Sequence, residues 1–253
     1  MSKGTECSGD RLSDSMRNIS AALVMMVLTI VAVPVVVVCG LFGWGDGFLA
    51  YGAWMMRVGR RILGIDVEAK GLDRIDPAER YIFMCNHLSF LDAPLLLTVL
   101  RRPVRFIVKR FVFRIPVLGL GMKFAGFVPL DKEGFGEGRK RIARAAELIK
   151  TKGYSFLVYP EGTRSWQGTL LPFRRGGFFL ALETGVPIAP ISVQGTYELM
   201  PRGSRRIRKG KVRIVFHEPI PVEGYSAEAM PELVERVRAV IASGLPPSPR
   251  PGG

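Results

Sequence analysis

The feature that most constrains this fold is a long uncharged stretch near the N-terminus. No charged residue occurs from Asn18 to Gly45, and Ala21–Val38 is apolar except for Thr29 and Pro34. At about 1.5 Å of rise per residue, a helix of this length reaches roughly 42 Å, more than the roughly 30 Å hydrocarbon core of a bilayer. That is long for a buried core helix, and no Ala-x-Ala-like cleavage site of a signal peptide follows it. We therefore predict an uncleaved membrane segment.

The residues that follow predict a second helix. Pro34 removes a backbone donor and is expected to kink or interrupt the first helix, and the glycines of Gly40–Gly47 offer a turn. Phe48–Leu63 then has apolar residues at helical spacing, typical of an amphipathic helix in the headgroup region, although a surface helix of the folded domain fits the same pattern. Its basic face consists of Arg57, Arg60 and Arg61. Three cations precede the apolar run and three follow it closely, so the positive-inside rule leaves both a single span and a one-sided hairpin open.

The charge balance narrows the class of partner. Lys and Arg number 36 against 22 Asp and Glu, which gives a formal net charge of +14, and the mean hydropathy is +0.21. These values exclude a disordered, collagenous or acidic chain and favour an anionic membrane surface or a nucleic acid as partner. Three scattered cysteines and two histidines form neither a disulfide framework nor a zinc-ligand spacing, so we expect no metal and no cofactor.

From Ile65 onward, short apolar runs alternate with helical stretches, which predicts an α/β domain. Strands are expected at 81–85, 104–108, 127–130, 155–159, 188–193 and 212–216, and helices at 92–100, 140–151, 178–184 and 227–243. Several strands are apolar enough to be covered on both faces, so the expected sheet is mixed, largely parallel and covered by helices. The expected organisation is a polar segment at 1–17, a membrane-anchoring helical segment at 18–64, the α/β domain at 65–245 and a disordered tail at 246–253.

One candidate for chemistry follows directly after a predicted strand, where α/β folds place ligand sites. The segment Asn86–Asp92 contains His87, whose ordinary pKa of about 6.5 leaves it largely neutral near pH 7. Asp92 is expected to accept a hydrogen bond from one ring nitrogen, which would orient His87 as a general base. The alternative role of Asp92 is a helix N-cap, because Ala93 and Pro94 follow it.

A second cluster, Tyr159–Ser165, also follows a strand and leads through 173–177 to the start of the helix predicted at 178–184. Arginines, loop amides and a helix N-terminus together suit a phosphate group. Either piece alone fits a solvated basic loop equally well. A third basic group surrounds the segment 109–132.

The motifs in this order resemble those of the glycerolipid acyltransferase family, whose bacterial members include 1-acyl-sn-glycerol-3-phosphate acyltransferases. The motifs are Asn-His-x-Ser-x-x-Asp at 86–92, Pro-Glu-Gly-Thr-Arg-Ser at 160–165 and Val-Pro-Ile-Ala-Pro-Ile at 186–191. The likeness covers about residues 65–220 and implies a glycerol-3-phosphate acyltransferase-like fold.

The resemblance also implies roles for single residues. His87 would be the catalytic base with Asp92 as its partner, and Arg164 would hold the phosphate of the acceptor. Lys132 stands where family members usually carry Arg. Lysine offers a point charge in place of the bidentate fork of arginine. The remaining expected substrate-site residues are Asn86, Ser89, Glu161, Gly162 and Thr163.

The activity that the resemblance implies is acyl transfer from a thioester to the free sn-2 hydroxyl of lysophosphatidic acid, giving phosphatidic acid. The acyl donor is acyl-CoA or acyl carrier protein, and the expected location is the cytoplasmic side of the inner membrane. The alternatives are a lyso-ornithine-lipid or other lysophospholipid acyltransferase and, in a different class, a basic membrane-anchored scaffold. No recognisable nucleic-acid-binding module occurs, so we expect no specific nucleic acid partner.

Three further features have simpler expected roles. No Gly-x-Ser-x-Gly elbow occurs, and Cys85 is expected to be a small apolar strand residue rather than a nucleophile. His217 is expected to be structural. The run from Arg202 to Arg213 has seven cations and no acid, which predicts a solvated hairpin or loop, or one that contacts anionic lipid or the phosphates of the acyl carrier.

Overall fold

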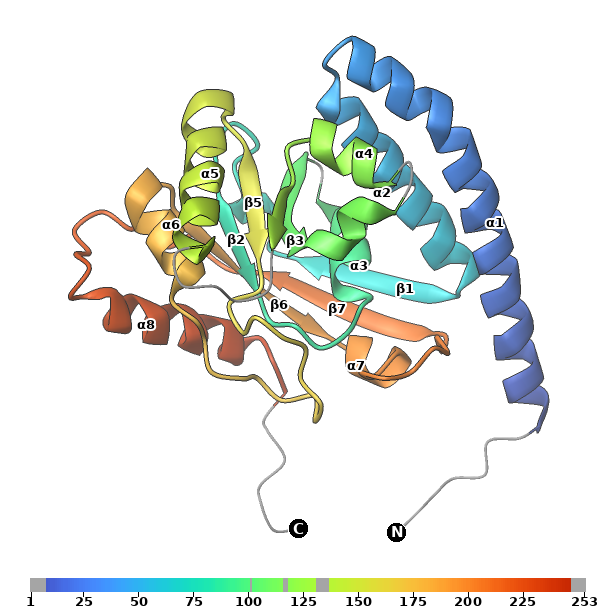
Figure 1. Ribbon diagram of the computed structural model, residues 1–253. Helices are drawn as coiled ribbons and strands as arrows, with labels where there is room; N and C mark the ends of the chain where they lie inside the picture. Colours follow the sequence, from blue (N-terminus) through green and yellow to red (C-terminus); the bar gives the residue numbers. More distant parts are fainter. Residues whose placement is uncertain (1–7, 101, 116–117, 131–136, 247–253) are drawn as a thin grey trace.

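The structure is a computed structural model that describes residues 8–100, 102–115, 118–130 and 137–246. Two long helices, α1 (Ser8–Leu41) and α2 (Gly45–Ile62), lie on one side of an α/β domain (Figure 1). The remaining helices are α3 (Asp92–Val99), α4 (Leu118–Phe124), α5 (Glu137–Lys152), α6 (Gly176–Thr184), α7 (Thr196–Leu199) and α8 (Met230–Ser243). Two short 3-10 helices occur at Leu72–Arg74 and Arg110–Arg114.

A seven-stranded sheet forms the centre of the domain, with the strand order β1-β7-β6-β2-β5-β3-β4. Its strands are β1 (Ile65–Lys70), β2 (Ile82–Cys85), β3 (Val104–Lys109), β4 (Val128–Leu130), β5 (Ser155–Val158), β6 (Ile188–Gln194) and β7 (Gly210–Phe216). Neighbours are parallel except β6 and β7, which are antiparallel. The predicted mixed, largely parallel sheet is therefore confirmed.

The alternation of side chains along β2 divides the core into two layers. Ile82 and Met84 pack into the cluster beneath α5, α6 and α8, whereas Phe83 and Cys85 pack into the cluster that includes residues of α3. All four side chains are fully buried. Since successive residues of a strand point to opposite faces, this apolar run is what a strand covered on both faces requires.

The helix α1 is longer and less interrupted than the sequence predicts. It begins at Ser8, inside the segment expected to be polar and separate, and it continues through Pro34 to Leu41. Pro34 was expected to kink or interrupt this helix, and the interruption does not occur; α1 instead curves along its length (Figure 1). The turn to α2 occupies residues 42–44.

The α1–α2 pair packs against the domain and exposes an apolar face. The segment Leu12–Leu41 is long and apolar enough to cross a membrane. It has a mean hydropathy of 3.0, and only 17% of its most apolar 18-residue stretch is buried. The apolar face of α1 consists of Leu12, Met16, Ile19, Leu23, Met26, Ile30, Val33, Val37 and Leu41, each exposed. The spacing of three or four residues puts them on one side of the helix. These residues form a continuous exposed apolar surface along α1.

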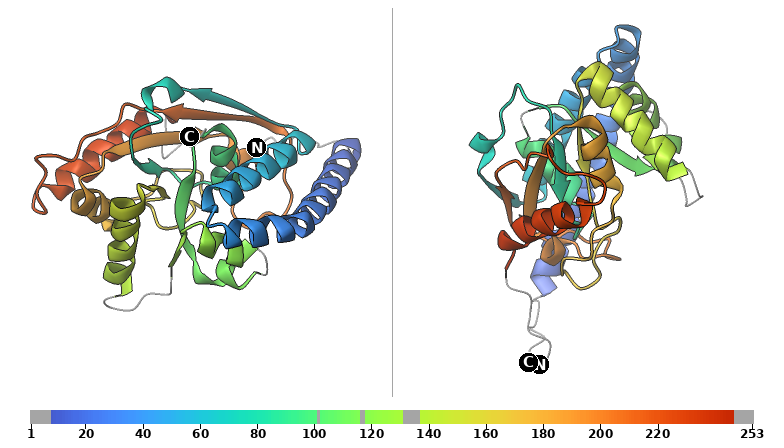
Figure 2. Two further views of the ribbon diagram at one scale, coloured as in Figure 1. Left: turned by 90° about the horizontal axis from the view of Figure 1, so that it is seen from above. Right: turned by 90° about the vertical axis from the view of Figure 1, so that its left-hand side faces the viewer.

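Polar and close contacts hold the opposite side of α1 to the domain. The side chain of Asn18 both donates to and accepts from the backbone of Ile207, at 2.9 Å and 3.2 Å, and Asp14 pairs with Arg206 at 2.6 Å. At the other end, Gly40 lies against the ring of Phe124 in α4. The views in Figure 2 agree that α1 follows the side of the domain.

Candidate active site

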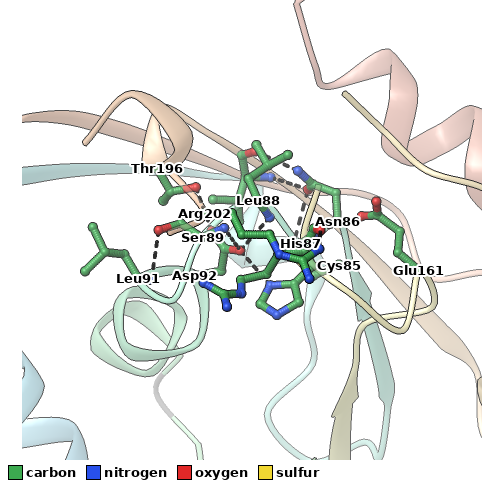
Figure 3. A network of polar contacts seen from close by, with 12 residues as sticks. Cys85, Asn86, His87, Leu88, Ser89, Leu91, Asp92, Glu161, Thr196 and Arg202 are labelled. Atoms are coloured by element: carbon green, nitrogen blue, oxygen red, sulfur yellow. Dashed lines mark hydrogen bonds and ion pairs between the residues drawn. The ribbon is translucent and has the colours of Figure 1, made fainter. Parts of the chain in front are cut away.

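His87 and Asp92 face each other across a short loop at the carboxyl end of β2. His87 Nδ1 lies 2.8 Å from Asp92 Oδ2 (Figure 3). A carboxylate oxygen only accepts, so Nδ1 donates its hydrogen and Nε2 keeps a lone pair. The His87 side chain is 20% exposed, whereas Asp92 is fully buried. This is the geometry of a general base with an orienting carboxylate.

Further donors hold the Asp92 carboxylate in place. The amides of Leu88 and Ser89 each donate to Oδ2 at 2.8 Å, and Thr196 Oγ1 donates to Oδ1 at 2.6 Å. Together with His87 these groups stabilise a negative charge at a dry position. The sequence left open a role for Asp92 as the N-cap of this helix. Asp92 is instead the first residue of α3, and its carboxylate accepts from amides that precede the helix.

Asn86 and Ser89 are buried and hold the same loop. Asn86 Nδ2 donates to the carbonyl of Val193 at 2.9 Å, and the amide of Val193 donates back to Asn86 Oδ1 at 2.8 Å, which joins the ends of β2 and β6. Ser89 Oγ donates to the carbonyl of Met200 at 2.7 Å and accepts from the amide of Leu91 at 3.2 Å. Both side chains therefore act on the loop that carries His87.

Glu161 connects the second motif to the first. Its Oε1 accepts from the amide of His87 at 2.6 Å, and its Oε2 accepts from the amide of Leu171 at 2.8 Å. The amide of Ser165 in turn donates to the carbonyl of His87 at 3.0 Å. Burial raises the pKa of Glu161 to about 7, although the two amide hydrogen bonds act in the opposite direction. The Pro-Glu-Gly motif is thus directly bonded to the backbone of His87.

The turn after Glu161 requires glycine and brings Arg164 to the site. Gly162 has φ +67°, a conformation that residues with a side chain rarely adopt, and a Cβ there would lie 2.8 Å from Arg174 Nε, so that side chain would have to shift. Two residues later, the guanidinium of Arg164 lies 3.5 Å from the centre of the Phe90 ring. Phe90 belongs to the loop that carries His87, so the two motifs meet at this stack.

Arg202 belongs to this site, which the sequence analysis missed. Its Nη1 donates to Thr163 Oγ1 at 3.1 Å and to the carbonyl of Arg164 at 2.7 Å, and its guanidinium lies 4.1 Å from the centre of the Trp166 ring. Burial and the nearby charge of Arg202 lower the pKa of Arg164. Arg202 is the first cation of the basic run at 202–213. The sequence analysis treated this run as one surface segment and so did not predict that Arg202 lies beside the site (Figure 3).

Two residues beside His87, the partly buried Tyr159 and the fully buried Cys85, have groups that stay protonated. The ring of Tyr159 stacks on His87 with ring centres 4.0 Å apart and planes at 18°. Within the described part of the chain its hydroxyl has no hydrogen-bond partner, and burial raises its pKa well above the ordinary value. Cys85 is fully buried, and burial, with Asp92 and Glu161 nearby, raises its pKa well above the usual range. Neither group supplies an anion near neutral pH.

The structure thus brings together eight of the nine site residues that the sequence singled out: Asn86, His87, Ser89, Asp92, Glu161, Gly162, Thr163 and Arg164. Lys132 lies outside the described residues. His217 lies elsewhere, with its Nε2 2.8 Å from Ser192 Oγ. The cations that follow Arg202 lie in the 203–209 loop and in β7.

Comparison with known proteins gives three concordant results. A family model described as Acyltransferase matches residues 66–194. The 1-acyl-sn-glycerol-3-phosphate acyltransferase alpha of Homo sapiens is 30% identical over 214 residues, which cover 85% of this chain and 75% of the relative. A chloroplastic 1-acyl-sn-glycerol-3-phosphate acyltransferase of Brassica napus is 41% identical over 155 residues, 60% of this chain but only 44% of the relative.

A solved structure agrees with this result. The crystal structure of the 1-acyl-sn-glycerophosphate (LPA) acyltransferase PlsC from Thermotoga maritima superposes with a TM-score of 0.70 at 28% identity, covering 90% of this chain and 97% of that one. The fold and the His–Asp site together define an O-acyltransferase of the α/β class. The chain belongs to the Acyltransferase family, because the family model spans half of it and the human relative aligns over three quarters of its own length.

Proposed function

We propose that this protein is a 1-acylglycerol-3-phosphate O-acyltransferase, which transfers a fatty acyl group from a thioester to the sn-2 hydroxyl of lysophosphatidic acid. The observation that carries the proposal is the 2.8 Å contact between His87 Nδ1 and the buried Asp92 carboxylate, with Arg164 on the adjacent loop. The activities of the human, plant and bacterial relatives, as their names give them, support the same substrates.

The acceptor hydroxyl is a weak nucleophile, so the reaction needs a base. His87 Nε2 takes the hydroxyl proton while the oxygen attacks the thioester carbonyl, and the imidazolium that forms is stabilised by Asp92. Collapse of the tetrahedral intermediate breaks the carbon–sulfur bond, and His87 returns the proton to the leaving thiolate. Proton transfer of this kind contributes about 10²- to 10⁴-fold, and fixing the acceptor through its phosphate supplies orientation in addition.

The remaining site residues have supporting roles in this proposal. Arg164 contacts the acceptor phosphate, and Lys132 supplies a further positive charge. Glu161, Gly162 and Thr163 shape the loop, since Glu161 bonds to the amide of His87. Asn86 and Ser89 act as positioning residues through the backbone. The catalytic unit corresponds to residues 65–245 and the membrane-anchoring unit to residues 18–64.

The same proposal includes a location at the cytoplasmic face of the inner membrane, with α1 and α2 inserted into one leaflet. Contacts with the domain near both ends of α1 support this arrangement, since Asn18 bonds to Ile207 and Gly40 abuts Phe124. A helix that crossed the bilayer would carry one end away from the domain. The exposed apolar face of α1 then faces lipid, and the lysolipid acceptor reaches the site from the leaflet.

Lipid analysis tests the activity. The purified full chain is incubated with phospholipid vesicles, a lysolipid and either acyl-CoA or acyl carrier protein loaded with a fatty acid, and products are identified by mass spectrometry alongside thiol release. We expect phosphatidic acid from lysophosphatidic acid. Acylation of a lyso-ornithine lipid alone would overturn the assignment of the acceptor. DNA or RNA binding without thiol release would overturn the assignment of the protein as an enzyme.

Single-cysteine labelling tests the location. One variant keeps only Cys7, and a second carries one introduced cysteine near the C-terminus. We expect a membrane-impermeant thiol reagent to reach both positions from the cytoplasmic side alone. Labelling of Cys7 only from the periplasmic side, with the C-terminus cytoplasmic, would replace the hairpin by an ordinary transmembrane helix.

A further inference from the structure

The guanidinium groups of Arg164 and Arg202, beside the active site, lie near each other without an acidic partner among the described residues. Arg202 Nη1 donates to the backbone carbonyl of Arg164 at 2.7 Å, and its charge acts on the Arg164 side chain, so two charged side chains from different loops lie near each other. Across the described residues, neither of them forms an ion pair with an acid. Asp92 is the carboxylate whose charge reaches Arg164, and its oxygens already accept four hydrogen bonds. The pair therefore has an unmatched positive charge.

The donors of both groups remain available to a ligand. A guanidinium has five N–H donors in its plane, and stacking on an aromatic ring uses its face and not its edge. Arg164 stacks on Phe90 and Arg202 stacks on Trp166. Only Nη1 of Arg202 donates within the described protein, which leaves its Nε and Nη2 free, and no described acceptor receives a bond from the Arg164 side chain. None of these nitrogens is a buried orphan.

The two stacking rings indicate the surroundings of this charge pair. Phe90 is 59% exposed and Trp166 is 64% exposed, although large apolar side chains are usually buried. Two cations flanked by two exposed aromatic rings suit a ligand that has an anionic head and an apolar body. The loop of Arg164 also bonds to the backbone of His87 through Glu161, so an anion held there lies on the same structural unit as the base.

We propose that Arg202 is a second phosphate-binding residue of the acceptor site, and that the Arg164–Arg202 pair selects a phosphate monoester over a phosphodiester. This inference rests on the proposed acyl transfer and concerns its acceptor class. A monoester phosphate has a charge of about −1.5 to −2 at pH 7 because its second pKa is about 6, whereas a diester has one negative charge. Two guanidinium groups match the dianion, and a diester leaves one of them unneutralised.

The experiment compares two lysolipids that differ only in the head group. Initial rates with lysophosphatidic acid and with lysophosphatidylglycerol are measured for the wild type and for Arg202→Gln, at saturating acyl-CoA. We expect Arg202→Gln to raise the KM for lysophosphatidic acid by about 10- to 100-fold, as for loss of one charged hydrogen-bond partner. The KM for lysophosphatidylglycerol should change less than about threefold, so the discrimination ratio falls.

Matched variants separate binding from structure. Arg205→Gln removes an exposed cation from the same 200–209 loop and is expected to leave both KM values unchanged. Arg202→Lys keeps the charge but loses the planar fork, so an intermediate ratio is expected; it also decides the case if Arg202→Gln does not fold. Equal losses with both lysolipids, in either variant, would mean that Arg202 only supports the loop, and would overturn the inference.

The remaining outcomes distinguish this inference from the proposed function. Acyl-CoA has phosphates too, including a monoester, so a raised KM for acyl-CoA with an unchanged acceptor KM would assign Arg202 to the donor and overturn the inference. A wild type that uses both lysolipids equally would also overturn it while leaving acyl transfer intact. A wild type that acylates neither lysolipid would instead contradict the proposed function.

Discussion

The two histidines of this chain occupy similar positions and differ in everything that decides chemistry. His87 follows the end of β2 and His217 follows the end of β7, and the register places Cys85, Ile191 and Phe216 in one row across the sheet. β7 runs opposite to β2, however, so His217 lies back toward the amino end of β2. A strand end alone therefore does not make a site, and the direction of the strand matters as much.

The partners of the two rings complete the contrast. His87 faces a buried carboxylate that stabilises its charged form, whereas His217 Nε2 faces the hydroxyl of Ser192, which also donates to the carbonyl of Ile241 at 2.6 Å. Burial and the nearby Arg74 lower the pKa of His217. A base must become charged during the reaction, and only the surroundings of His87 favour that step.

The largest expected effect is that of His87→Ala. We expect thiol release from acyl-CoA to fall roughly 10³- to 10⁴-fold, because the group that takes the proton is absent. Circular dichroism and vesicle flotation should match the wild type. Folded, membrane-bound variant protein with near-normal turnover would contradict the mechanism.

Asp92→Asn is expected to cost about 10²- to 10³-fold in kcat. The amide keeps the shape but has no charge to stabilise the imidazolium, so a large part of the roughly 10²- to 10⁴-fold contribution of proton transfer is lost. The measurement is kcat with saturating lysophosphatidic acid and acyl donor. A drop confined to KM would assign Asp92 to substrate binding.

Thr196→Val tests how far the carboxylate depends on its support, with Ser192→Ala as the matched control at the other histidine. Removing the 2.6 Å bond to Asp92 Oδ1 should reduce kcat about 3- to 10-fold and destabilise the fold by roughly 1–3 kcal/mol. Ser192→Ala should destabilise the protein similarly while kcat stays unchanged. Equal losses of kcat would remove the distinction between the two regions.

His217→Gln should have the smallest effect, with activity within about twofold of the wild type. Its consequence is in the pH dependence of stability. Because the pKa of His217 is below 6.5 in the folded protein, the unfolded chain binds more protons between the folded value and 6.5, and His217 destabilises the fold as the pH falls through that range. The variant should lose this acid-side slope in thermal unfolding curves; an unchanged slope would contradict the assignment.

The sequence predicted the strands whose own residues are apolar enough to indicate burial in the sheet. The runs that became β2, β5 and β6 are largely apolar and were placed to within one residue at each end. β1 was not predicted, because Asp66, Glu68 and Lys70 alternate through this edge strand and its burial is slight.

The interruption expected at Pro34 was wrong. Tyr51 Oη donates to the carbonyl of Leu28 before the proline, Val36 and Cys39 pack into the core after it, and α1 is one continuous helix.

The motifs predicted most residues of the site, but not the long-range hydrogen bonds that join the motifs. The pairing of His87 with Asp92, five residues apart, was predicted from their spacing together with the motifs shared with a known family. The bond from the amide of His87 to Glu161 joins residues 74 apart, and Arg202 reaches Arg164 from 38 residues away. Such contacts depend on where β5 and α7 lie in the folded sheet, which the residues themselves do not encode locally.

The pairing of Asn18 with Ile207 has a consequence for how the chain is made. The two residues are 189 positions apart, so at about 5–20 residues per second the ribosome needs roughly 10–40 s to supply the partner of α1. During that time the side of α1 that faces the domain lacks its partner at Ile207. On the proposed membrane location, α1 therefore enters the bilayer before the domain closes, and the last-made part of the sheet docks onto a helix that is already embedded.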